Sequence, residues 1–261
     1  MNQKDNCYDH PRYYEIAFAF RDIQKEVDVI GQTVQRFAPG QASPRILQLA
    51  CGPSQHMVEL ARRGWQFEGL DISQAMLDYS QARAVSAGID ARFHRQSMVD
   101  FRLPQPVDYV FIALGDLYVQ STDELKSHLA SVASALRSGG LFLLDWCIQF
   151  EPAKMFKPEG DTWTMEKDGV SVAAHVRMKP FNHPEQLFEE QFGIDVTDGD
   201  TRLSLSSHSI KRAVYPQEFL ELVKNMGQLE FIGWWNHWNL DDPLTPASEN
   251  IFRPITLLRK L

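Results

Sequence analysis

Apolar runs of strand length alternate with helical patterns along the first 150 residues, and this alternation constrains the fold more than any other feature. Helical patterns occupy residues 57–63, 73–88 and about 121–137. The apolar runs that they connect lie at 45–50, 67–72, 91–96, 107–114 and 141–146. Because a β-α-β connection makes successive strands parallel and places helices on both faces, this region predicts a covered parallel sheet.

The pattern changes after Phe150. Period-two alternation marks DTWTMEKDG, VSVAAHVRMK, QLFEEQFGIDV and TRLSLSSHSIKR, with turn signals between them. The chain then returns to a helix at 216–226 and to two strands, at 229–235 and 254–261. We therefore expect a Rossmann-like, seven-stranded, mostly parallel sheet built from residues 1–150 and 213–261. Residues 151–212 would form a small inserted antiparallel β-sheet, placed as a lid for substrate recognition.

Charge and composition exclude several classes of partner. The net charge of -8 and the lack of a basic stripe argue against nucleic acid. No apolar run is long enough to span a membrane, and MNQKDNCYDHPRYYE lacks the apolar region of a signal peptide. Three scattered cysteines have no metal-ligand spacing and suit a reducing compartment. We expect a cytoplasmic protein without a metal; the sequence does not indicate its oligomeric state.

Glycine or polar residues follow the predicted strands at their carboxyl ends: Gly52, Asp71, Ser97 with Met98, and Asp116. Ligands of open α/β sheets bind beyond these ends, near the point where the strand order reverses. Taken singly, each residue also fits a structural role, such as a helix cap for Asp71 or a core position for Met98. Their occurrence in order, each after a strand, favours a ligand site.

Two long segments resemble the class I S-adenosylmethionine-dependent methyltransferases. LQLACGPSQHMVELARRGWQFEGLDISQAMLDYSQARA is similar to their motifs I and II, and VDYVFIALGDLYVQSTDELKSHLASVASALRSGGLFLLD to their fourth strand, helix and fifth strand. Tyr13-Tyr14-Glu15, followed by a charged amphipathic helix, resembles the small-molecule N-methyltransferases of this superfamily. The resemblance implies S-adenosylmethionine as cofactor and a small-molecule acceptor, with nitrogen favoured over oxygen.

The resemblance also implies roles for single residues around the nucleoside. Asp71 would bind the ribose hydroxyls, and Ile72 and Met98 would sandwich the adenine. Ser97 lies where a side chain or backbone amide would reach the adenine edge.

Around the methionine part, the resemblance transfers backbone contacts to Ala50, Gly52 and Leu114, and places Tyr14 over the sulfonium. Two positions depart from the family pattern. Gln48 replaces an acidic residue near the end of strand one, and Pro53-Ser54 replaces a second glycine of the turn. These changes put tight cofactor binding in question.

Three other functions compete with methyl transfer. A non-catalytic binding subunit with this fold would explain Gln48 and Ser54. A nicotinamide enzyme would need glycines at 52, 54 and 57, but the chain has Gly52, Ser54 and Met57. Aminopropyl or other alkyl transfer from a related cofactor would use the same pocket.

The candidates for a catalytic role are Tyr14, Asp116, Tyr118 and His208. Asp116 is the expected base, because it follows strand four beside the transferring methyl group, but a turn residue would also fit there. Methyl transfer from a sulfonium requires mainly alignment, so the sequence carries no sharp catalytic motif.

The predicted lid would present side chains to the acceptor. Trp163, His175 and His208 are expected on its inward face, and Arg177 and Arg212 could pair with a substrate carboxylate. Its aromatic residues and three tryptophans near the last strands would either shape an apolar pocket or pack in the core: Phe150, Phe156, Phe181, Phe188, Phe192, Trp234, Trp235 and Trp238.

Overall fold

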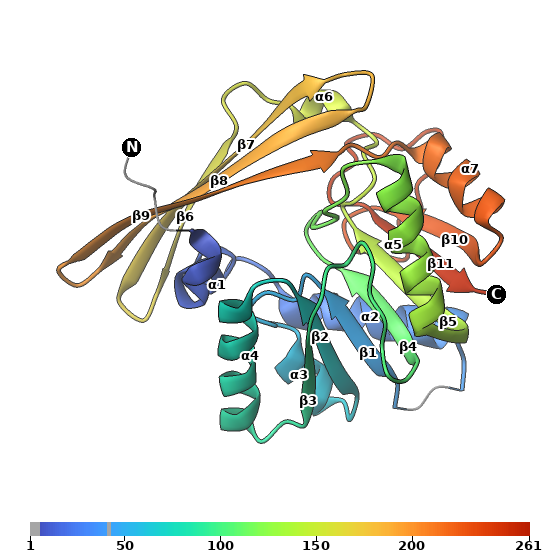
Figure 1. Ribbon diagram of the computed structural model, residues 1–261, viewed down its shortest axis with the longest axis horizontal. Helices are drawn as coiled ribbons and strands as arrows, with labels where there is room; N and C mark the ends of the chain where they lie inside the picture. Colours follow the sequence, from blue (N-terminus) through green and yellow to red (C-terminus); the bar gives the residue numbers. More distant parts are fainter. Residues whose placement is uncertain (1–5, 41–42) are drawn as a thin grey trace.

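The computed structural model describes residues 6–40 and 43–261, and its frame is a seven-stranded sheet in the order β10-β11-β5-β4-β1-β2-β3 (Figure 1). The first five strands of the chain are parallel to one another, and β11 is antiparallel to both of its neighbours. The strands are β1 (Arg45–Leu49), β2 (Gln66–Asp71), β3 (Ala91–Arg95), β4 (Val107–Ile112), β5 (Leu136–Asp145), β10 (Leu229–Trp235) and β11 (Ile255–Lys260). The predicted fold class is confirmed, and the strand order reverses between β1 and β4.

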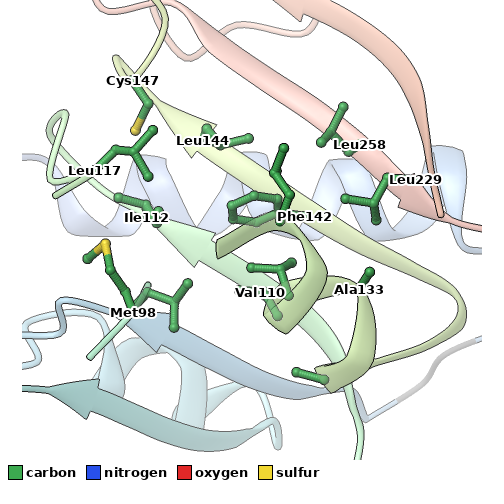
Figure 2. Packing of buried hydrophobic residues seen from close by; sticks show 14 of the residues in the cluster. Met98, Val110, Ile112, Leu117, Ala133, Phe142, Leu144, Cys147, Leu229 and Leu258 are labelled. Atoms are coloured by element: carbon green, nitrogen blue, oxygen red, sulfur yellow. The ribbon is translucent and has the colours of Figure 1, made fainter. Parts of the chain in front are cut away.

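Helices cover both faces of this sheet and create two apolar cores. On one face α5 (Thr122–Ala135) and α7 (Pro216–Met226) bury Leu129, Val132 and Phe219 against the strands. Figure 2 shows Phe142 in this core, with Val110 and Leu144. On the other face lie α2 (Ile23–Phe37), α3 (Met57–Arg62) and α4 (Gln74–Ala87). Strands β1 and β4 are buried along their whole length because both of their faces are covered.

Local signals fix the helix ends. The Ser73 side chain accepts a hydrogen bond from the Met76 N–H, and the Ser121 side chain accepts one from the Glu124 N–H. Gly88 ends α4 in the left-handed conformation that a glycine adopts without strain. A serine before the first turn and a glycine after the last turn thus determine where these helices begin and end.

The junction between α5 and β5 differs from the prediction. The helix ends at Ala135 rather than near Arg137, and β5 begins at Leu136, which pairs with Val107. Gly140 therefore lies inside the strand. An added Cβ there would come within 3.0 Å of the Asp108 carbonyl oxygen, so the close approach of backbone requires glycine.

A separate four-stranded antiparallel sheet, here called the lid sheet, follows the short helix α6 (Pro152–Met155). Its strands are β6 (Asp161–Lys167), β7 (Val170–Asn182), β8 (Leu187–Asp198) and β9 (Thr201–Arg212), paired in chain order. The predicted change to antiparallel strands is thus confirmed.

The N-terminal segment lies between the two sheets (Figure 1). It comprises the 3-10 helix η1 (Cys7–Asp9) and α1 (Pro11–Ala17), which packs on β6, β7 and β8 and also contacts α4. Part of the stretch judged unlike a signal peptide, residues 1–5, lies outside the described residues. Within the described part of the chain, no helix is both long and apolar enough to cross a membrane.

Candidate active site

A cavity of about 600 Å³ opens where the carboxyl ends of β1, β2 and β4 meet the N-terminal segment and strand β9. All of the predicted site residues except Leu114 line it: Tyr14, Ala50, Gly52, Asp71, Ile72, Ser97, Met98, Asp116 and His208. This is the edge at which the strand order reverses, as expected for a ligand site of an open α/β sheet.

The turn after β1 provides a backbone cradle. Ala50, Gly52 and Ser54 all have positive φ, at 46°, 50° and 51°. The Ser80 hydroxyl donates to the Gly52 carbonyl and ties the turn to α4. A Cβ added to Gly52 would meet no atom within 4 Å, so this backbone faces open space. Space beside this turn is therefore open to a ligand, while the Gly52 N–H and carbonyl are already hydrogen-bonded to Asp71 and Ser80.

Asp71 joins this turn to the next strand. Its Oδ2 accepts a hydrogen bond from the Gly52 N–H at 2.8 Å, and its Oδ1 accepts one from the Ser73 N–H at 2.9 Å. Burial raises the Asp71 pKa, although these backbone donors oppose the shift. Each oxygen retains a lone pair, so the carboxylate is able to accept two further hydroxyl groups.

Two apolar side chains line the cavity next to Asp71. Ile72 is 70% exposed, which is unusual for a large aliphatic residue, whereas Met98 is buried. Met98 is held by two contacts: His128 Nδ1 lies 2.8 Å from its carbonyl oxygen, and the Tyr118 N–H lies 3.4 Å from its sulfur. Ser97 uses its hydroxyl to accept from the Val99 N–H. An aromatic ring bound here would cover the exposed Ile72 side chain.

Leu114 does not line the cavity. Its N–H donates to Asp145 Oδ2 at 2.8 Å, and its φ of 55° turns the chain sharply after β4. The backbone donor is therefore committed to a carboxylate at the end of β5, and the predicted contact with a ligand stays a prediction.

A polar cluster, here called the acceptor cluster, lies at the other end of the cavity: Tyr8, Asp116 and Tyr118 line the cavity, and Glu190 and Lys211 adjoin these residues without lining it. Lys211 Nζ lies 2.9 Å from Glu190 Oε2 and 4.2 Å from the centre of the Tyr118 ring. The Tyr8 and Tyr118 hydroxyls are 3.0 Å apart, and the Tyr118 hydroxyl donates to Asp116 Oδ1 at 3.4 Å. The cluster therefore joins η1, the loop after β4 and two strands of the lid sheet.

Burial raises the pKa of Asp116 to about 7; Lys211 opposes this shift and Glu190 adds to it. Burial alone would lower the pKa of Lys211, but the carboxylates of Glu190 and Asp116 outweigh it and raise that pKa. The pKa of Tyr14, which lines the same cavity, lies well above its ordinary value because the ring is buried and Asp116 is close. Asp116 is thus the group here with a pKa near neutrality, as a general base requires.

Tyr8, Glu190 and Lys211 were not predicted from the sequence. Glu190 and Lys211 lie on the inward face of the lid sheet, in register with Phe192 and Leu205 along β8 and β9. A charged residue on a buried strand face is a usable signal, but it becomes visible only after the face of each strand is known.

The predicted inward face of the lid sheet is partly wrong. Trp163 does face inward, and its Nε1 donates to the Ala17 carbonyl at 2.6 Å. His175 is exposed on the opposite face, because it alternates with the buried Val172 and Ala174. His208 reaches the cavity rim but also alternates with buried residues, and its Nδ1 lies 3.1 Å from Glu189.

None of the aromatic residues predicted for the pocket is among those lining the described cavity. Phe192 and Trp163 pack with Phe18, Phe150 packs on Trp234, and Phe156 packs on Phe188. Trp235 and Trp238 belong to the core on the α2 face, and Phe181 is exposed. The core interpretation of most of these residues is therefore the right one.

A second buried polar cluster lies beneath the glycine turn. Glu26 contacts Arg21, His56 and Arg253, with His56 Nε2 and Arg253 Nη1 each 2.8 Å from a carboxylate oxygen. Arg253 continues the network to Asp145 at 2.6 Å. Burial would raise the Glu26 pKa, but His56 and the two guanidinium groups hold it well below its usual range. The network joins α2, the turn and the end of β5.

Comparison with known proteins finds a family match over part of the chain. Residues 46–140 match the model of the methyltransferase domain family. Over 174 residues the chain is 29% identical to a dTDP-3-amino-3,4,6-trideoxy-alpha-D-glucopyranose N,N-dimethyltransferase of Streptomyces venezuelae, covering 63% of this chain and 68% of that relative.

Solved structures match nearly the whole chain. An S-adenosylmethionine-dependent methyltransferase from Clostridium acetobutylicum superposes with a TM-score of 0.75 at 20% identity, covering 98% of this chain and 99% of the other. CalS10, an amino pentose methyltransferase from Micromonospora echinaspora solved with S-adenosylmethionine bound, gives 0.72 at 18% identity, covering 95% and 96%. At these identities the likeness concerns the fold.

The protein therefore carries a methyltransferase domain over residues 46–140 and has the fold of the S-adenosylmethionine-dependent methyltransferases. It is an enzyme, and its cofactor is S-adenosylmethionine. The alternatives of a non-catalytic subunit and a nicotinamide enzyme find no support in these comparisons.

Proposed function

We propose that the acceptor is an amine on a small polar molecule such as an amino sugar, bound between Asp116 and the lid sheet. The observation that carries this proposal is the acceptor cluster, a buried carboxylate with a pKa of about 7 among tyrosine hydroxyls at one end of the cavity. The names of two relatives, both N,N-dimethyltransferases of dTDP-linked amino sugars, support an amine acceptor.

We assign the residues along the cavity to the parts of S-adenosylmethionine as follows. Asp71 would accept the ribose hydroxyls, while Ile72, Met98 and Ser97 would surround the adenine. Ala50 and Gly52, with the backbone of Leu114, would hold the methionine part. Tyr14 would then lie over the sulfonium, between the cradle and the acceptor cluster.

The cofactor supplies an already activated methyl group, so the protein has two tasks. It aligns the nitrogen lone pair with the carbon–sulfur bond, and it removes one proton from nitrogen. Asp116 would take that proton, and the Tyr118 hydroxyl, which donates to it at 3.4 Å, would hold the carboxylate in position. His208, on the rim and paired with Glu189, would contact the body of the acceptor.

We propose that two parts of the chain bind the two substrates separately. Residues 1–150 and 213–261 would bind the cofactor, and residues 151–212 would select the acceptor. Glu190 and Lys211 support this division, because both reach the acceptor end from the lid sheet. The three buried cysteines, which have no metal-ligand spacing, support a reducing, cytoplasmic location.

The experiment is a transfer assay with matched acceptors. Purified protein and S-adenosylmethionine are incubated with an amino sugar and with the same sugar carrying a hydroxyl in place of the amine. Mass spectrometry should find one or two added methyl groups on the amine compound only. Methylation of the hydroxyl compound at an equal rate would contradict an amine-specific site.

A further inference from the structure

The charges on the cavity wall are all of one sign. Among the described lining residues, Asp71, Asp116 and Glu124 are carboxylic acids, His208 lies at the rim, and lysine and arginine do not occur. With Asp71 assigned to the cofactor, Asp116 and Glu124 face the acceptor. The acceptor end of the cavity therefore presents acids and hydroxyls.

Cationic side chains close to this end are already committed to protein carboxylates. Lys211 is buried against Glu190, and Arg212 Nη2 lies 2.9 Å from Glu218. Arg177, the other residue considered for a substrate carboxylate, is exposed on the outer face of β7, where it alternates with Val176. Neither of the two arginines predicted for an anionic substrate is thus available to one.

The helix that begins at the mouth of the cavity is also closed to an anion. Helix α5 follows Gln120, and helix N-termini commonly bind phosphate through their free N–H groups. Here the Ser121 hydroxyl accepts from the Glu124 N–H, and the Glu124 carboxylate accepts from the Gln120 N–H at 2.7 Å. Asp123 and Glu124 add two negative charges to this first turn. A phosphate placed there would meet like charge.

Recognition of phosphate or carboxylate in proteins depends on arginine, lysine or free backbone N–H groups. We propose, resting on the amine acceptor above, that the acceptor carries no phosphate or carboxylate group: it is a free amine or an amino glycoside without an anionic group, not a nucleotide-linked amino sugar. In this respect the enzyme differs from the relatives named for dTDP-linked substrates. The acids at the mouth instead attract a protonated amine and guide it toward Asp116.

Matched acceptors test the charge preference. The same 3-amino sugar is supplied as a methyl glycoside and as a dTDP-linked sugar, and kcat/KM is measured from S-adenosylhomocysteine formation. The glycoside should be preferred by at least about tenfold, because like-charge contacts cost several kcal/mol. Preference for the dTDP-linked sugar would overturn the proposal.

A binding measurement separates this inference from the proposed function. Thymidine diphosphate is titrated into protein loaded with S-adenosylhomocysteine. Undetectable binding supports the proposal even if no amine is methylated, a result that would count against the amine acceptor alone. Micromolar binding would overturn the charge preference whatever the transfer assay gives.

A charge-reversal variant supplies the converse test. In Glu124→Lys the ratio of kcat/KM for the methyl glycoside to kcat/KM for the dTDP-linked sugar should fall by about tenfold, because the variant has a cation at the mouth of the cavity. Glu221→Lys, an equal charge change at an exposed position on α7, is the control and should leave the ratio unchanged. An unchanged ratio in Glu124→Lys, or an equal change in Glu221→Lys, would contradict a local charge effect.

Discussion

Glu26 and Asp116 are carboxylates withdrawn from water near the same edge of the sheet, but their surroundings move their pKa values in opposite directions. Glu26 contacts two guanidinium groups and a histidine, which hold its pKa low. The cation that acts most strongly on Asp116 is Lys211, which is shared with Glu190; Arg21 acts less, and burial raises the Asp116 pKa to about 7. The fully neutralised acid serves the fold, whereas the under-neutralised acid is suited to exchange a proton.

The largest effect is expected from removing the neutralised acid. Glu26→Gln leaves Arg21 and His56 without their carboxylate and should lower the free energy of unfolding by about 3–5 kcal/mol at pH 7. Urea unfolding measures it. Glu59→Gln, which breaks surface pairs with Arg62 and Arg63, should cost no more than about 1 kcal/mol.

The Glu26 effect should also depend on pH in a definite direction. Because the pKa is lowered in the folded state, Glu26 stabilises the protein above its unfolded pKa, and that stability is lost as the pH falls. The difference in the free energy of unfolding between wild type and Glu26→Gln should therefore become smaller as the pH falls. A difference that grows in acid would contradict this role.

Removing the Asp116 carboxylate should lower the rate of methyl transfer without lowering the free energy of unfolding. Asp116→Asn should lower kcat by about 100-fold or more, with the KM for S-adenosylmethionine within about twofold. Because the folded pKa is raised, wild type loses stability as the pH rises from about 4 to 7, so the variant should be at least as stable at pH 8. A variant that melts earlier at pH 8 would show that Asp116 is structural.

The Asp71 carboxylate has an intermediate environment. Burial raises its pKa, and hydrogen bonds from two backbone N–H groups oppose that shift. Asp71→Ala removes charge-assisted hydrogen bonds worth about 1.5–3 kcal/mol and should weaken S-adenosylmethionine binding by at least about tenfold. Calorimetry with a folded variant gives the value. Asp90→Ala, at an exposed position, is the control, and unchanged affinity in Asp71→Ala would remove its assigned role.

The same contrast explains what the sequence could and could not predict. Asp71 and Met98 follow strands within recognisable motifs, so local pattern places them at the carboxyl edge. The strands that contribute Glu190 and Lys211 were predicted, but not which of their faces packs on α1, and the error at His175 has the same origin. Glu26 and Arg253 are 227 positions apart, and only tertiary packing brings them together. Helix α5 was extended too far because Leu136 continues its apolar pattern, while strand pairing determines its conformation.

Substitution of Lys211 tests how the surrounding charges set the pKa of Asp116. The groups facing Asp116 are Tyr8 and Tyr14 from the N-terminal segment, Arg21, Asp71, Tyr118, and Glu190 with Lys211 from the lid sheet. Lys211→Met removes the cation that lowers the Asp116 pKa, so the ascending limb of the kcat–pH profile should move to higher pH.

In wild type this limb should lie at or below pH 7, because the sulfonium charge also lowers the Asp116 pKa. Lys211→Arg should restore the wild-type position of the limb. A Lys211→Met enzyme with lower kcat but an unmoved limb would assign Lys211 to packing.

The smallest effect is expected at Ser54, where the family pattern has a glycine. Ser54 is buried and has a φ of 51°, a conformation that glycine adopts without strain, and it is not among the residues lining the cavity. Ser54→Gly should therefore keep S-adenosylmethionine affinity within about twofold or improve it. Glycine usually destabilises a fold by about 0.5–1 kcal/mol through its backbone entropy, and relief of the strain at positive φ should offset this cost. The free energy of unfolding should therefore change by less than about 1 kcal/mol. Calorimetry and urea unfolding measure the two quantities. A large loss of S-adenosylmethionine affinity would mean that the Ser54 hydroxyl is needed to hold the turn in its binding conformation, although Ser54 does not line the cavity.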